Sequence, residues 1–164
     1  MSIINVASQK IIKDELSTLT NKELQAIILR MTRFRKENKE LLTYLLFDSK
    51  DEQEYVKLIK SEMETALSTV SSTNARISLK LIRRVLRNTR KAIKFSGKDE
   101  TEVQLLLHYC NLLKSKNLPL TRIKALNAIW SRCILNIGKA ITSLHEDLRY
   151  DYGKELKMLT EDEV

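Results

Sequence analysis

Glycine and proline are almost absent from this chain, and no other feature restricts its fold as strongly. The 164 residues include 3 Gly and 1 Pro, whereas average usage of about 12% would supply about 20. Sandwiches, barrels and Gly-rich phosphate loops need turns that these two residues favour. The composition therefore predicts an all-α protein. A chain of this length can bury one core without disulfides or a structural metal, so we expect a single domain spanning residues 1–164.

Apolar residues recur at intervals of three and four along most of the chain, which predicts about five to six helices. Capping boxes mark two helix starts, Thr20 with Glu23 and Ser49 with Glu52. The apolar face that begins after Thr20 continues to Phe47. Short polar links predict antiparallel neighbours in a bundle or a short helical array.

The later helices differ in how far their apolar residues extend around the axis. The segment 103–113 is apolar nearly all round, so we expect it to be the central helix. One apolar face then runs from residue 123 to 148, and we expect that helix to end near Gly153. At the ends, residues 1–15 are weakly patterned and expected to fray, and residues 154–164 are expected to form a short turn and an acidic tail.

Positive charge is concentrated in one predicted helix. Residues 73–98 hold nine cations and no acidic residue, which exceeds the net charge of +8 for the whole chain. At about 100° per residue these cations share about a third of the helix circumference. Ile77, Leu81, Val85, Leu86, Ala92 and Ile93 occupy the remaining arc. The nine cations, which we call the basic stripe, are Arg76, Lys80, Arg83, Arg84, Arg87, Arg90, Lys91, Lys94 and Lys98.

The basic stripe predicts a surface that binds polyanions, with the backbone of a nucleic acid as the leading partner. Few aromatic residues accompany the charge, so contact with little sequence discrimination is expected. Four cations on the following helix would widen the surface if the two helices are neighbours: Arg122, Lys124, Arg132 and Lys139.

Two alternatives to nucleic-acid binding remain open. The stripe is explained equally well as a solvated face. Alternatively it docks on acidic residues, either on a partner protein in an interaction or scaffold module, or within the chain on Asp51, Glu54 and Glu62.

Residues suited to catalysis or metal binding form no pattern in the sequence. Cys110 and Cys133 lack metal-ligand spacing and are expected to be small core residues. His108 points away from Cys110 on a helix and is expected to be partly buried, and His145 is expected at an exposed helix end. We therefore expect a protein that is not an enzyme and has no catalytic residue, cofactor or metal.

No segment of the sequence suggests export or membrane insertion. The longest uncharged run, residues 103–113, is shorter than the roughly 20 residues a membrane helix needs, and the N-terminus does not have the pattern of a secretory signal. A cytoplasmic protein without a membrane partner is expected.

The stretch from Leu16 to Leu24, followed by Ile28, Phe34 and residues 38–42, resembles the opening of a family of small uncharacterised all-helical bacterial proteins. The resemblance implies an all-α fold with no assigned activity and supplies no functional residues.

Overall fold

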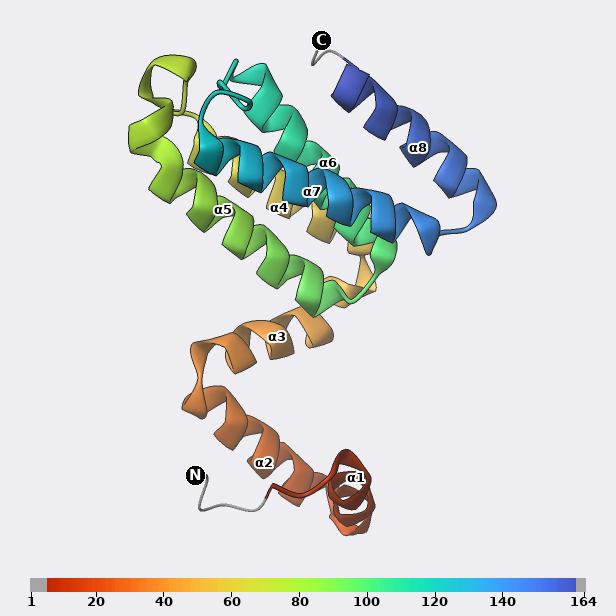
Figure 1. Ribbon diagram of the computed structural model, residues 1–164. Coiled ribbons are helices and arrows are strands. Elements are labelled where there is room, and N and C mark those ends of the chain that lie inside the picture. The colour runs from red at the N-terminus through yellow and green to blue at the C-terminus, as the bar shows by residue number, and fades with distance from the viewer. Residues whose placement is uncertain (1–5, 162–164) are drawn as a thin grey trace. The chain divides into compact units, whose positions relative to one another are not determined.

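The computed structural model describes residues 6–161, and these residues are all-helical, as the composition predicts (Figure 1). No strand occurs in this part of the chain. The number of α-helices exceeds the expected five to six. They are α1 (Gln9–Thr18), α2 (Asn21–Phe34), α3 (Lys36–Leu46), α4 (Glu52–Leu67), α5 (Ala75–Ser96), α6 (Asp99–Ser115), α7 (Lys124–Thr142) and α8 (Glu146–Glu161), with short 3-10 turns at Asp48–Lys50 and Ser72–Asn74.

The chain divides into two compact units, the first ending at Leu46 and the second beginning at Phe47. The N-terminal unit contains α1, α2 and α3. Only Tyr44 is buried among residues 6–46. The C-terminal unit contains the other helices and almost all of the buried apolar residues.

The first helices are separated by a break that the apolar pattern does not show. Helix α1 is formed, with Ser8 as its N-cap. The Thr20–Glu23 capping box is present at the start of α2. Helix α2 then ends because Arg35 adopts an extended conformation, and the Asn38 amide donates to the Met31 carbonyl at 2.9 Å. A side chain thus satisfies a terminal carbonyl of α2, and the predicted continuous face to Phe47 is split between two helices.

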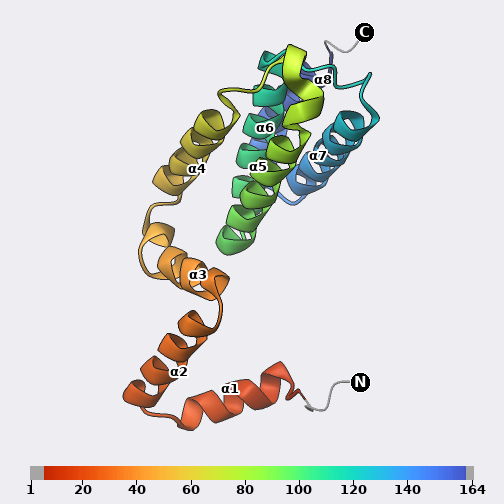
Figure 2. The same ribbon diagram turned by 90° about the vertical axis from the view of Figure 1, so that its left-hand side faces the viewer.

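Helix α6 is the centre of the C-terminal unit, as its sequence predicts. It packs against α4, α5, α7 and α8 (Figures 1 and 2). Val103, Leu105 and Cys110 are fully buried on it, and Tyr109 donates from its hydroxyl to the Ile82 carbonyl of α5 at 3.0 Å. This hydrogen bond satisfies a buried polar group and fixes α5 against the centre of the unit.

The C-terminal region forms two helices where the sequence predicts one followed by a turn. Helix α7 ends at Thr142, and α8 then packs against both α7 and α6. Gly153 lies inside α8 and does not end it. Leu159 is buried, and Tyr152 shares hydrogen bonds with Gln104 and Glu100 of α6. Because α8 has its own apolar side, folding back on α6 buries surface that a straight extension of α7 would expose.

The start of α4 is built around two acidic residues. Asp51 is the N-cap and accepts from the Glu54 backbone N–H at 3.0 Å, so the predicted cap at Ser49 is wrong by two positions. Glu52 accepts hydrogen bonds from Ser96 at 2.5 Å and Thr101 at 2.7 Å. Glu52 therefore holds the turn between α5 and α6 against α4.

Candidate nucleic-acid interface

Helix α5 presents one apolar face to the bundle and one charged face to solvent. Ile82, Val85 and Leu86 are buried, and Tyr55 of α4 donates to the Ala92 carbonyl at 3.3 Å. The helix stops at Gly97, whose φ of +66° is the left-handed conformation that glycine adopts without strain. Packing of the apolar face therefore fixes which side of α5 faces outward (Figure 2). Ile77 is an exception to the predicted apolar arc, because it is 87% exposed.

The structure separates the nine cations of the basic stripe into two groups. Six are exposed and form no ion pair with any carboxylate of residues 6–161, and we call them the open stripe: Arg76, Lys80, Arg83, Arg84, Arg87 and Lys94. The other three, Arg90, Lys91 and Lys98, are half-buried or paired. From Arg76 to Lys94 the open stripe extends about 27 Å, at 1.5 Å per residue.

Arg90 turns inward between α5, α6 and α7. Its Nη2 atom is buried and has no hydrogen-bond partner among the described residues. Contact with the Cys110 thiol, and after it the charge of the Arg90 guanidinium, lower the pKa of the Cys133 thiol. Cys110 and Cys133 are both buried free thiols that face each other across α6 and α7, which confirms their prediction as core residues. Arg90 therefore belongs to the core edge and not to the open stripe.

Lys98 is held by an acidic residue of α4. Its Nζ lies 3.0 Å from Glu52 Oε2, and the Glu52 side chain is only 14% exposed. The three acidic residues expected to neutralise the stripe from within the chain do not do so in the described region. Asp51 caps α4, Glu54 pairs with Lys57 at 3.4 Å, and Glu62 is exposed.

Arg122 joins the surface at the start of the open stripe. A pocket of about 550 Å³ lies between the beginning of α5 and the link from α6 to α7, and Arg76, Ile77, Pro119 and Arg122 line it. Arg122 precedes α7 instead of lying on it as the sequence predicts, and this link brings it beside Arg76. Lys124, Arg132 and Lys139 are exposed on α7, whereas α5 packs mainly against α4 and α6.

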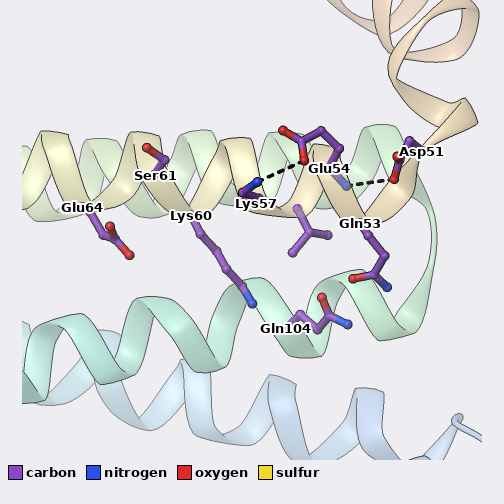
Figure 3. A pocket seen from close by; sticks show the side chains of 9 residues that line it. Asp51, Gln53, Glu54, Lys57, Lys60, Ser61, Glu64 and Gln104 are labelled. Atoms are coloured by element: carbon purple, nitrogen blue, oxygen red, sulfur yellow. Dashed lines mark hydrogen bonds and ion pairs between the residues drawn. The ribbon is translucent and has the colours of Figure 1, made fainter.

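A second pocket, of about 630 Å³, lies between α4 and α6 (Figure 3). Its lining mixes both signs of charge, with Glu54 and Glu64 beside Lys57 and Lys60. The Lys60 side chain extends from α4 toward α6 in Figure 3. Asp51 also lines the pocket, so its acidic residues outnumber its lysines by three to two and the pocket has no net preference for an anion.

The two histidines occupy the kinds of position that the sequence predicts. His108 is partly buried, with Nε2 3.1 Å from Glu64 Oε1, and burial lowers its pKa while Glu64 opposes that shift. His145 and Asp147, 3.5 Å apart, are largely exposed at the start of α8. Within residues 6–161 no three His, Cys, Asp or Glu side chains gather in a way that could hold a metal ion.

Comparison with known proteins gives no relative for this chain: no family model matches it, and no curated protein or solved structure shows significant similarity. The resemblance of residues 16–42 to a bacterial family therefore stays a prediction. None of the described helices is both long enough and apolar enough to cross a membrane.

Proposed function

We propose that this chain is a non-catalytic binding module that holds the phosphate backbone of a nucleic acid along the open stripe of α5. The observation that carries the proposal is the exposure of six cations on one helix face without a carboxylate partner in the described residues. Four of the six are arginines, whose guanidinium groups form paired hydrogen bonds with phosphate oxygens.

The open stripe is long enough to reach several phosphates of a polyanion. Along one strand of a duplex, phosphates follow at about 3.4 Å of helix axis, so the 27 Å of the stripe corresponds to roughly eight base pairs. Like charges three or four residues apart destabilise a helix by about 0.2–0.5 kcal/mol per pair. A bound phosphate backbone would convert this mutual repulsion into shared attraction to one ligand.

The contacts expected are to phosphates and not to bases. Phe95 is the only aromatic residue of α5, and it is half-buried. Stacking of unpaired bases on aromatic rings therefore has no support on this face, and side chains that contact only phosphates carry no sequence information. Arg122 extends the same surface at the pocket beside Arg76.

Charge reversal tests the proposal directly. We expect Arg83→Glu/Arg87→Glu to lose binding to labelled duplex DNA and single-stranded RNA, measured by fluorescence anisotropy at low salt. The matched control is Arg149→Glu/Lys157→Glu, which makes the same change in net charge at exposed positions of α8. Equal loss in both variants would show that overall charge, and not the open stripe, produces the binding.

An acidic protein is the alternative partner, because exposed arginines also pair with clustered carboxylates. A complex with such a protein would survive nuclease treatment and would form without nucleic acid. If the chain binds neither nucleic-acid probe at low salt but forms a nuclease-resistant complex, the interaction-module alternative replaces the proposal.

A further inference from the structure

The N-terminal unit has an apolar face on α2 that the other helices of this unit leave exposed. The large apolar side chains on this face are between 39% and 79% exposed, and they are Ile27, Ile28, Met31 and Phe34. At on the order of 170 Å² for a fully exposed side chain of this size, together they present about 370 Å².

This exposed area is in the range of the largest apolar patch on a typical monomer, which is often a functional surface. It would supply part of the roughly 800 Å² that each partner of a stable protein pair buries. On α2 the apolar residues Leu24, Ile27, Met31 and Phe34 follow the alternating three- and four-residue spacing of a helix that pairs with another helix. The surface is therefore of the kind that a helical partner covers.

Two charged residues beside the apolar face of α2 would form ion pairs with the same two residues of a second copy. At 100° per residue, Glu23 and Arg30 lie about 100° and 120° from Leu24 on the same flank of the stripe. When two copies of a helix pair antiparallel about a two-fold axis, each flank faces the same flank of the partner. Glu23 of one copy then faces Arg30 of the other, twice in the dimer. In a parallel pair the same flank would face the other flank of the partner, where Ile28 and Arg35 occupy the matching heptad positions. Glu23 would then face no cation.

Glu23 can serve both its own helix and such a partner. Its Oε2 atom accepts from the Thr20 backbone N–H at 2.8 Å and from the Thr20 hydroxyl at 2.7 Å. The capping box uses this one oxygen, and no contact in residues 6–161 engages Oε1. The cap also holds the Glu23 side chain at the start of α2, so little rotamer entropy is lost when a partner guanidinium binds.

We propose that a second copy of this chain covers the apolar face of α2, with the two α2 helices antiparallel and Glu23 of each copy paired with Arg30 of the other. The inference rests on the N-terminal unit and does not depend on the proposed binding of nucleic acid by α5. Its consequence for that function is that a dimer presents two open stripes, one from each copy.

The test is sedimentation of the nuclease-treated full chain at micromolar concentrations. We expect a dimer that Met31→Glu abolishes and that Arg30→Glu weakens by at least about tenfold, since two attractive pairs become repulsive. Arg33→Glu is the matched control, because Arg33 is exposed on the side of α2 away from the stripe. Far-UV circular dichroism checks that each variant keeps its helix content.

Three results would overturn the inference. A chain that is monomeric throughout the concentration range does not use the apolar face of α2 to bind a second copy. A dimer that survives Met31→Glu uses a different surface. A dimer weakened equally by Arg30→Glu and Arg33→Glu does not have the antiparallel two-fold pairing.

Discussion

Reversing one charge of the open stripe should stabilise the protein while it weakens binding. Arg83 lies three residues after Lys80 and four before Arg87, and all three are exposed. Arg83→Glu removes two repulsive pairs, with Lys80 and with Arg87, and creates two attractive pairs in their place. Each pair lost and each pair gained is worth about 0.2–0.5 kcal/mol. Arginine and glutamate have similar helix propensities. The free energy of unfolding should therefore rise by about 0.8–2 kcal/mol at low salt.

Thermal unfolding followed by circular dichroism measures this gain. For a chain of this size, 1 kcal/mol corresponds to about 2–4 °C in Tm. Arg132→Glu is the control, because no charged residue lies three or four positions from Arg132 on α7. At about 1 M salt, where the screening length is about 3 Å, the advantage of Arg83→Glu should largely disappear. If Arg83→Glu is no more stable at low salt than Arg132→Glu, repulsion among the cations of the open stripe does not destabilise the protein.

Three further predictions concern the C-terminal unit. Glu52→Gln should lower the urea midpoint by the equivalent of about 1–3 kcal/mol, because it removes the ion pair to Lys98 and weakens two short hydrogen bonds; an unchanged midpoint would contradict the role of Glu52. Burial depresses the pKa of His108 below 6.5, so protonation opposes folding and the protein should lose stability as the pH falls from 7 to 5. In His108→Gln this loss of stability should be smaller. An equal loss in both proteins would show that protonation of His108 does not cause it. Gly153→Ala should stabilise the protein by about 0.5–1 kcal/mol, because Gly153 lies inside α8 with open space around the new methyl group. Gly97→Ala should destabilise the protein, because the φ of Gly97 is +66°. Thermal melts that rank the two variants in the opposite order would contradict these assignments.

The sequence predicts elements whose own residues determine them. The basic helix predicted within residues 73–98 corresponds to α5, which ends at Ser96 with Gly97 as its cap. The Thr20–Glu23 capping box forms because both hydrogen bonds are local. The apolar segment 103–113 is central because a helix that is apolar all round must be covered on most sides. Each of these features depends on spacing within one helix, which periodicity records directly.

Features that depend on distant parts of the chain escape prediction. The break after Thr142 separates two helices that share one continuous apolar pattern. It forms because α8 buries more apolar surface by packing on α6 than it would as a straight extension of α7. Within the predicted site, a helical wheel places Arg90 with the open cations, but its guanidinium turns to the thiol of Cys133 on α7. The pairing of Lys98 with Glu52 likewise joins residues from different helices. Because these neighbours lie on other helices, the spacing of residues within α5 cannot predict the contacts.

The salt dependence of nucleic-acid binding tests the central claim most directly. On B-DNA the logarithm of affinity falls with that of salt at about −0.9 per phosphate neutralised. If the six cations of the open stripe each contact a phosphate, the slope is about −5, and affinity for a short duplex falls roughly 10³-fold between about 50 and 200 mM salt. Arg83→Glu/Arg87→Glu should bind weakly with a slope shallower by about 2. Absence of binding at 50 mM, or a slope near zero, would contradict the assignment of α5 as a phosphate-binding surface.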